Sequence, residues 1–189
     1  ERKLAEYGCE MVFHKVCDDD PAGITAAILE AKEAGCELIF TTGGMSVDPD
    51  DRNPLAIRNT GADIVTYGAP VLPGAMFLVS YLDGVPVCGL PGCVMYAKRT
   101  IFDLLLPRLL ADDPITAEDI ARLGEGGLCL GCAECHWPNC GFGHCCCPLR
   151  RFAPALPRGE PLASYPSTKN CKAKQRALLS GLIYELRDY

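Results

Sequence analysis

The sequence lacks long apolar runs and has few basic residues. No stretch of its 189 residues approaches the roughly 18 consecutive apolar positions typical of a membrane-spanning helix, and its first residues lack a signal-peptide pattern. Lysine and arginine total 18 against 24 acidic residues, which gives a formal net charge of -6. Nucleic-acid surfaces need clustered Lys and Arg. We therefore expect a cytoplasmic protein with neither a membrane nor a nucleic-acid partner.

The chain is long enough for one full domain and a smaller appendage. Residues 1–7 resemble the second half of an amphipathic helix without an initiator Met, so we expect a piece of a longer protein. Three parts are predicted: a main domain over 1–113, a short helix with a cysteine-rich, metal-binding segment over 114–147, and a tail over 148–189. The tail has little core material, and we expect it to be loosely ordered with a terminal helix near 173–186.

Strands and helices alternate through the main domain. A helix after Asp20 and Pro21 is predicted from its N-cap and from an apolar face formed by Ile24, Ala27, Ile28 and Ala31. Further helices are expected at 1–8, 53–59 and 94–110, and strands at 9–16, 37–40, 61–67, 75–82 and 85–90. This alternation predicts an α/β fold in three layers, with a mostly parallel sheet and helices on both faces.

Two glycine-rich loops follow strands of this predicted sheet. Thr41-Thr42-Gly43-Gly44-Met45-Ser46 comes after one apolar strand, and Leu90-Pro91-Gly92 after another. Carboxyl ends of parallel strands form the edge where open α/β sheets bind ligands. Glycines let backbone amides approach a phosphate, and a helix N-terminus adds a favourable dipole. Either loop alone is equally well explained as a strand-to-helix turn, whereas the pair indicates a phosphate-binding site.

The order of these motifs resembles a known family. Thr41-Thr42-Gly43-Gly44-x-Ser46-Val47, Pro73-Gly74 and Gly89-Leu90-Pro91-Gly92 occur in this order, with residues 79–87 between the last two. The combination is similar to the MoaB/Mog-type molybdopterin-binding domain over roughly residues 1–110, and most similar to molybdopterin molybdotransferases of the MoeA type. The resemblance implies the three-layer fold, binding of molybdopterin or its adenylylated form, insertion of molybdate with release of AMP, and homo-oligomers.

The resemblance also implies roles for individual residues. The catalytic residues it implies are Asp50 and Asp51, and Asp48 and Asp51 are the implied ligands of Mg²⁺. Molybdate and phosphate repel each other, so a hard cation on carboxylate oxygens has to bridge them. The cofactor-binding residues it implies are Thr41, Thr42, Gly43, Gly44, Ser46, Pro73, Gly74, Leu90, Pro91 and Gly92.

Two positions depart from the transferase pattern. The family's Ser-Val-Gly-Asp-x-Asp is replaced by Ser46-Val47-Asp48-Pro49-Asp50-Asp51, which ends like the related competence-damage-inducible branch. Cys93-Val94 stands where Asn-Pro is usual, so Cys93 is either a ligand-facing thiol or a small residue at a helix start. Three functions stay open: the molybdotransferase, a molybdopterin adenylyltransferase, and a carrier that delivers finished cofactor to a molybdoenzyme without turnover.

Thirteen cysteines form the second unusual feature, and seven of them fall between residues 129 and 147. Cys129-x2-Cys132-x2-Cys135-x4-Cys140 resembles the C-x2-C-x2-C run of bacterial ferredoxins, although the fourth spacing differs. Zinc sites more often pair two C-x2-C units over a longer separation. We therefore expect these four cysteines to hold a [4Fe–4S] cluster or, alternatively, Zn²⁺, rather than disulfides. Trp137 either shields this centre or stacks on the pterin.

Overall fold

A computed structural model of the chain describes residues 2–144 and 176–181, and for the latter range the backbone alone. In these ranges the centre is a six-stranded sheet with the order β1-β6-β2-β5-β4-β3. The pairs β1/β6, β6/β2 and β2/β5 are parallel, and β5/β4 and β4/β3 are antiparallel. The strands are β1 Glu10–Met11, β2 Leu38–Thr42, β3 Asp63–Tyr67, β4 Leu78–Leu82, β5 Val85–Leu90 and β6 Arg176–Gly181.

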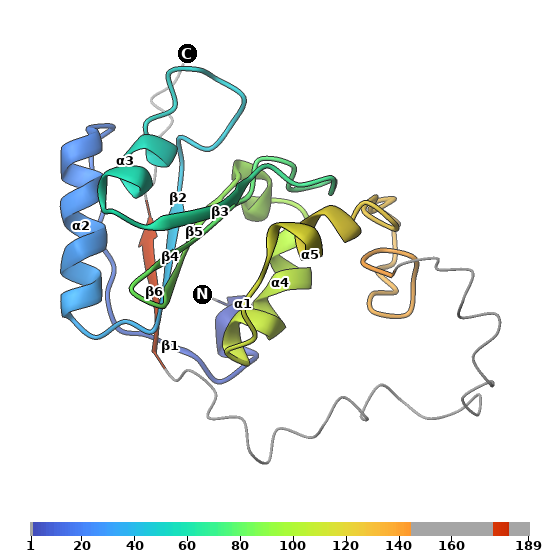
Figure 1. Cartoon of the computed structure of the whole chain (residues 1–189). Coiled ribbons are helices and arrows are strands. Elements are labelled where there is room, and N and C mark those ends of the chain that lie inside the picture. Colours follow the sequence, from blue (N-terminus) through green and yellow to red (C-terminus); the bar gives the residue numbers. More distant parts are fainter. Residues whose placement is uncertain (1, 145–175, 182–189) are drawn as a thin grey trace.

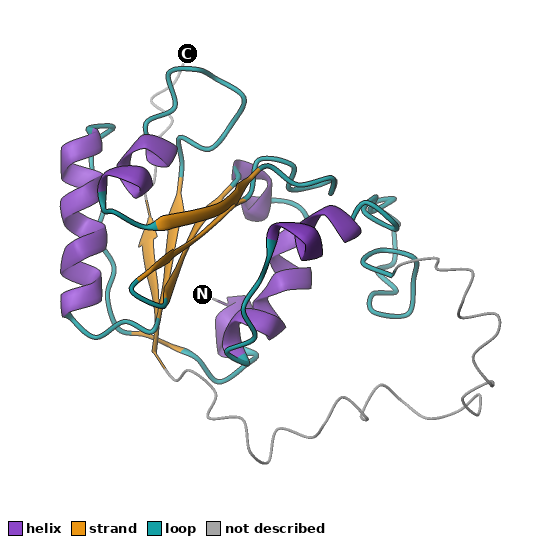
Figure 2. Ribbon diagram, viewed as in Figure 1, coloured by secondary structure: helices purple, strands orange, loops and turns teal. Residues whose placement is uncertain are grey.

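Helices cover both faces of this sheet, which confirms the predicted three-layer α/β fold. Figures 1 and 2 show α2 and α3 on one side and α1, α4 and α5 on the other. The helices are α1 Arg2–Ala5, α2 Pro21–Glu33, α3 Asn53–Asn59, the 3-10 helix η1 Gly92–Met95, α4 Ile101–Leu110 and α5 Ala117–Arg122. None of the helices in the described ranges is long and apolar enough to cross a bilayer.

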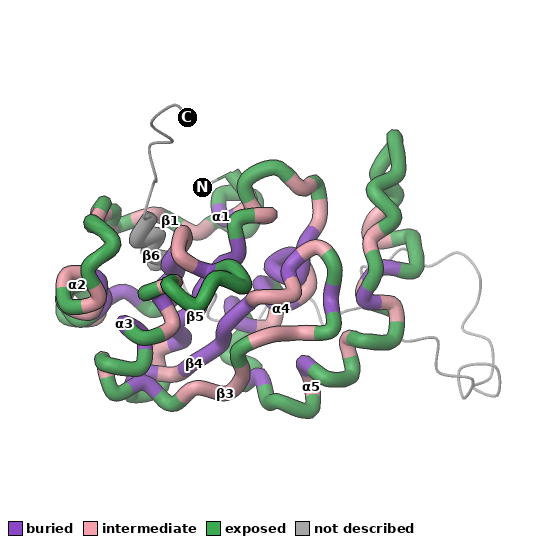
Figure 3. Tube along the Cα trace, turned by 90° about the horizontal axis from the view of Figure 1, so that it is seen from above, coloured by how far each residue is buried: buried purple, intermediate pink, exposed green. Residues whose placement is uncertain are grey.

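Two hydrophobic cores lie on opposite faces of the sheet, and successive side chains of β2 point into one and then the other. Leu38 and Phe40 are buried in the cluster that includes α4, and the Phe40 ring meets Phe102 edge-on at 5.2 Å between centroids. Ile39 points the other way, into the cluster formed with α2 and α3. Successive strand residues face opposite sides of a sheet, so a β2 with apolar residues on both faces needs a cover on each. Figure 3 shows this buried layer between the exposed outer surfaces.

The start of α2 agrees with the sequence prediction. Asp20 is the N-cap, and its carboxylate accepts a hydrogen bond of 2.9 Å from the Gly23 N–H. Pro21 occupies the first turn, where no backbone donor is needed. The predicted apolar face is buried: Ile24, Ala27, Ile28 and Ala31.

The predicted helix over 94–110 is wrong in its first half. The chain forms only the short η1 helix at Gly92–Met95, and α4 begins at Ile101. Thr100 explains this start: its hydroxyl accepts from the Phe102 N–H at 3.2 Å, while Asp103 accepts from the Thr100 N–H at 2.8 Å. This capping box satisfies the free amides at the start of α4 and fixes where the helix begins.

Asp103 also ties three segments together inside the protein. Its carboxylate is 2% exposed and lies 2.6 Å from the Lys3 ammonium of α1 and 2.8 Å from the Arg99 guanidinium. A buried carboxylate is tolerated only when it is paired and hydrogen-bonded, and here both conditions hold. The short α1 helix is thereby fastened to the start of α4.

The terminal helix predicted near 173–186 is not formed where the structure describes this region. Residues Arg176–Gly181 instead form β6, which pairs in parallel with β1 on one side and β2 on the other. Two neighbouring strands offer hydrogen-bond partners along both edges of this segment, so sheet formation overrides the amphipathic helical pattern. The rest of the predicted tail lies outside the described residues.

Candidate functional site

The strand register brings three loops to one edge of the sheet. Thr41 pairs with Gly89, Gly89 with Leu78, and Leu78 with Tyr67, so these four residues form one row across β2, β5, β4 and β3. The carboxyl ends of β2, β3 and β5 therefore meet at a single edge, from which the loops 43–52, 68–77 and 91–100 depart (Figure 1). This is the ligand-binding edge of open α/β sheets.

The first loop is fixed to the sheet by an apolar side chain. Gly43 and Gly44 have φ angles of 87° and 51°, which ordinary side chains rarely adopt. The following Met45 is 3% exposed and covers Gly89 of β5, where an added Cβ would lie 2.5 Å from the Met45 Cε atom. The absence of a side chain at Gly89 thus makes room for Met45, and this contact joins the two glycine-rich segments.

The acidic end of this loop is held by hydrogen bonds within itself. The Ser46 N–H donates to the Asp51 carboxylate, and the Asp50 N–H donates to the Asp48 carboxylate at 3.0 Å. Asp48 and Asp50 are exposed, and Asp51 is half-buried. Each of these hydrogen bonds uses one of the two oxygens of its carboxylate. The loop is thus closed while its acidic groups stay near the surface.

Tyr67 supports this loop from β3. Its hydroxyl donates a hydrogen bond of 3.2 Å to the Ser46 carbonyl. Burial of the ring, followed by the negative charge of Asp51, raises the pKa of Tyr67. Because the phenol stays protonated, it remains a donor to the loop at ordinary pH.

The residues implied to contact the cofactor fall into two groups. Exposed or half-buried positions near the edge are Thr42, Gly43, Gly44, Ser46, Pro73 and Gly92. Buried positions are Thr41, Gly74, Leu90 and Pro91. The first group offers surface to a ligand, and the second shapes the backbone beneath it.

Thr41 and Gly74 illustrate the buried group. The Thr41 hydroxyl donates toward the Cys88 carbonyl of β5 at 3.5 Å, inside the sheet. Gly74 has a φ of 122°, and a Cβ there would lie 2.5 Å from Cγ2 of Ile101. Gly74 therefore permits close packing of its loop on α4, which is a structural role. The α-helix N-terminus that was expected to add a favourable dipole at Gly92 is also absent, because Gly92 begins only the four-residue 3-10 helix η1.

The acidic residues fit Mg²⁺ by their chemistry. Across residues 2–144 and 176–181, no group of three or more His, Cys, Asp and Glu side chains is arranged to hold a metal ion. Magnesium, however, is usually bound through one or two carboxylates together with phosphate oxygens of the ligand and water. Asp48 and Asp51 supply such carboxylates on the loop next to the glycines.

Comparison with known proteins identifies the domain. The family model described as "Probable molybdopterin binding domain" matches residues 1–111, which is more than half of the chain. The chain belongs to this family. The edge described above is therefore the edge of a molybdopterin-binding domain.

Individual relatives are distant and much longer. The molybdopterin molybdenumtransferase of Haemophilus influenzae is 27% identical over 104 residues, which are 55% of this chain and 25% of the relative. The enzyme of the same name from Staphylococcus aureus strain COL is 32% identical over 92 residues, 48% of this chain and 22% of the relative. The catalytic subunit of dihydroorotate dehydrogenase B from Malacoplasma penetrans is 30% identical over 93 residues, 48% of this chain and 30% of the relative. The chain thus spans less than a third of each of these proteins.

Asn53 supports the glycine loop of the candidate site, and the sequence patterns did not reveal it. It opens α3, is 1% exposed, and donates from Nδ2 to the Gly43 carbonyl at 2.9 Å. Among the buried side-chain N and O atoms of the described residues, its Oδ1 atom is the one without a hydrogen-bond partner. The signal that could have revealed it is a polar residue directly before Pro54 at a predicted helix start, close after a glycine-rich loop in the sequence.

Replacing Asn53 by alanine should loosen the glycine loop. We expect a loss of about 1 kcal/mol in the free energy of unfolding, because one hydrogen bond disappears. Amide hydrogen exchange at residues 43–46 should become faster than in the wild type. Asn59→Ala, at the exposed end of the same helix, is the matched control. Unchanged exchange at residues 43–46 in Asn53→Ala contradicts this role.

The cysteine-rich segment follows the molybdopterin-binding domain and packs against its second loop. Leu72 forms a parallel bridge with Leu128, its N–H donates to the Gly127 carbonyl at 2.7 Å, and its carbonyl accepts from the Cys129 N–H at 2.8 Å. Phe142, at the other end of the segment, is 3% exposed in the α4 core. The segment is thus attached at both ends to the loop and helix beside the candidate site.

Cationic residues before α4 complete this attachment. The Lys98 ammonium donates to the Ala133 carbonyl at 2.8 Å, and the Arg99 guanidinium lies over the Trp137 ring at 4.4 Å from its centroid. A backbone hydrogen bond from Trp137, followed by the side chain of Arg99, lowers the pKa of Cys135.

Burial instead raises the pKa of Cys93 in the loop after β5, which is half-buried. Cys93 therefore favours a neutral thiol, as expected of a small residue packed at the loop.

Proposed function

We propose that this chain acts in molybdenum cofactor biosynthesis, where it binds molybdopterin or its adenylylated form and inserts molybdate with release of AMP. The observation that carries the proposal is the row of paired residues that brings the loops after β2 and β5 to one edge. Membership of the molybdopterin-binding domain family supports the ligand, and two relatives carry the name of the transferase.

The backbone is the main anion-binding element in this proposal. The chain carries a formal charge of -6, so its surface offers no excess of cationic side chains to a phosphate. Gly43 and Gly44, with no side chains in the way, let a phosphate approach the backbone, and Thr42 contributes a hydroxyl beside them. Gly92 does the same from the second loop, where the space around its Cα atom is open.

Asp51 connects metal binding to phosphate binding. Its carboxylate accepts from the Ser46 N–H, so this donor is already used. If Asp51 were to hold Mg²⁺ through this oxygen instead, the Ser46 N–H would be free to bind a phosphate oxygen. Asp48 is the second carboxylate for the metal, and Asp50 is the acidic group left to orient the attacking oxygen. Held by these carboxylates, Mg²⁺ would neutralise the negative charge of the phosphate and of molybdate.

Replacing Asp51 by asparagine tests this proposal. The amide is nearly isosteric but has no charge for Mg²⁺, so we expect the affinity for molybdopterin in the presence of Mg²⁺ to fall about 10–100-fold. Without Mg²⁺ the two proteins should bind with similar affinity. The measurements are equilibrium binding with and without Mg²⁺, and AMP release from adenylylated molybdopterin after addition of molybdate.

The matched control is Asp19→Asn, an exposed aspartate before α2 that lies outside this loop. It should bind and turn over as the wild type does. If Mg²⁺ raises the affinity for molybdopterin equally in the wild type and in Asp51→Asn, Asp51 does not bind the metal ion. Failure of the wild-type chain to bind either form of molybdopterin would overturn the proposed function.

One observation favours a carrier without turnover as the second candidate. Asp48 and Asp51 each accept a backbone N–H of their own loop, so the loop closes without a metal ion. A carrier would bind finished cofactor tightly, release no AMP, and pass the cofactor to a molybdoenzyme. The same assays separate the two functions, and a requirement for ATP would indicate the adenylyltransferase instead.

A further inference from the structure

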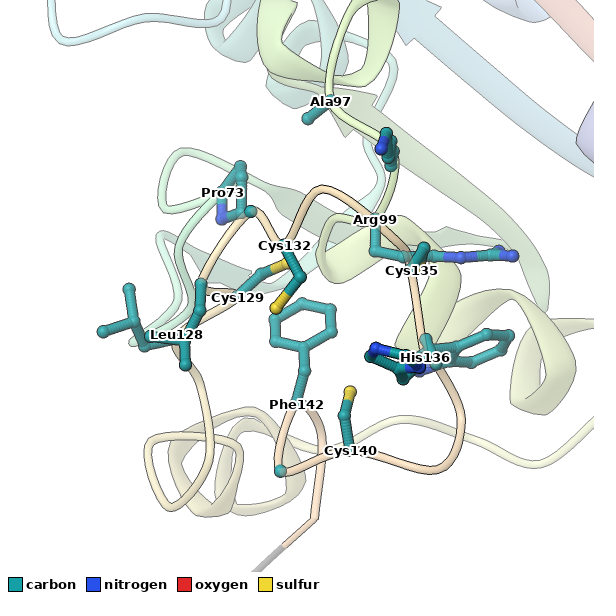
Figure 4. A pocket seen from close by; sticks show the side chains of 15 residues that line it. Pro73, Ala97, Arg99, Leu128, Cys129, Cys132, Cys135, His136, Cys140 and Phe142 are labelled. Atoms are coloured by element: carbon teal, nitrogen blue, oxygen red, sulfur yellow. The ribbon is translucent and has the colours of Figure 1, made fainter.

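Four cysteines outside the molybdopterin-binding domain surround a cavity of about 270 Å³. Cys129, Cys132, Cys135 and Cys140 all line it, together with Arg99 and other residues of the adjoining loops. In the view of Figure 4, the sulfur atoms of Cys129, Cys132 and Cys140 are directed toward the space around the Phe142 ring. The proposed function uses none of these thiols.

The segment that carries them has too little structure of its own to explain why they gather. Between α5 and residue 144 it forms turns and one isolated bridge, with no helix or strand. Its ends are fixed by the backbone of Leu72 and by buried Phe142, whereas Cys132, Cys135 and Cys140 between them are exposed. Metal ligation supplies the folding energy that short loops of this kind lack.

The size of the cavity distinguishes a cluster from a single ion. In a zinc site four sulfurs converge to about 2.3 Å from one metal atom. Here no three such ligands within the described ranges are arranged around a single point. The four thiols instead line a space of about 270 Å³. A cubane of iron and sulfide, which takes one thiolate at each of its four iron atoms, suits thiols that are spread around a space better than a single zinc ion does.

The remaining lining fits a negatively charged occupant. Lys98 and Arg99 both line the cavity, and they offset the charge of four thiolates. Trp137 and Phe142 contribute aromatic surface, and Pro73 of the molybdopterin-binding domain also lines the cavity. We propose that Cys129, Cys132, Cys135 and Cys140 ligate one [4Fe–4S] cluster in this cavity. Each thiol gives up its proton to solvent as its iron–sulfur bond forms.

The test uses the full chain, purified without oxygen and reconstituted with sulfide and equal amounts of ferrous and ferric iron, which together supply the oxidation states of a [4Fe–4S] core of charge 2+. We expect iron and acid-labile sulfide in equal amounts, corresponding to one cluster per chain, and a broad absorption near the blue end of the visible spectrum. Mössbauer spectra of the wild-type protein, reconstituted with ⁵⁷Fe, should show one thiolate-ligated cubane. This measurement needs no variant, so it decides the proposal even where a substitution impairs folding.

Variants assign the ligands. Cys132→Ser and Cys140→Ser should each lower bound iron at least several-fold, whereas Cys17→Ser, a half-buried thiol beside α2, should leave it unchanged. Cys146→Ser should also keep the cluster. A wild-type chain that holds zinc and takes up no iron overturns the proposal, as does a cluster lost in Cys146→Ser but kept in Cys140→Ser. Molybdopterin binding is measured separately, so failure of the proposed function is distinguishable from failure of this one.

Discussion

Replacing Asp103 by alanine is expected to lower the free energy of unfolding by about 3–5 kcal/mol. We expect no other single charged residue in the described ranges to have a larger effect on stability. The carboxylate is 2% exposed and bonds to Lys3, Arg99 and the Thr100 N–H. Its removal leaves two cations without their partner and an amide at the start of α4 without its acceptor. Chemical denaturation followed by circular dichroism measures the loss.

An ion pair on the surface provides the control for Asp103→Ala. Arg108 and Asp113 lie 2.6 Å apart, but the Asp113 side chain is 53% exposed. Exposed pairs contribute little because water already solvates both charges, so Asp113→Ala should cost about 0–1 kcal/mol. If Asp103→Ala costs no more than Asp113→Ala, the buried network does not stabilise the fold as described.

Replacing Gly127 by alanine should strongly destabilise the attachment of the cysteine-rich segment. A Cβ at this position would lie 2.2 Å from the Pro70 carbonyl oxygen and 2.8 Å from that of Leu123. Both obstacles are backbone atoms, which cannot rotate away as a side chain can. We expect a loss of about 2–4 kcal/mol in stability and separation of the segment from Leu72.

Gly141→Ala is the matched control in the same segment. A Cβ there meets no atom within 4 Å, and its φ is not positive. The two variants differ only in where one methyl group is added. Thermal unfolding gives the stability, and limited proteolysis reports whether the segment has separated. Similar behaviour of both variants would show that the contact with Pro70 is not close in solution.

Sequence patterns predicted the layers and the paired loops because both depend on local signals. Asp20 and Pro21 start α2 at the expected place, and apolar residues at helical spacing form its buried face. Glycine-rich segments after two apolar strands predicted a shared edge, and the register of β2 with β5 confirms it. These signals lie within a few residues of the elements that they specify.

Long-range pairing could not be predicted in the same way. The pattern of residues 173–186 fits a helix, and only the presence of β1 and β2 on either side makes a strand of Arg176–Gly181. At the candidate site, the burial of Thr41 and the hydrogen bond from Asn53 to the Gly43 carbonyl depend on the folded arrangement of separate segments. The start of α4 could have been predicted, since Thr100 and Asp103 have capping-box spacing.

The position of β6 also determines when the sheet can be completed. During synthesis β1 and β2 leave the ribosome well before β6, and each then has an unpaired edge facing the other across one vacant strand position. Until β6 has been synthesised, a strand from another nascent chain can pair with the same edges. Folding of the sheet is therefore a competition between pairing with β6 and intermolecular pairing, and slow synthesis of the residues between β5 and β6 favours intermolecular pairing.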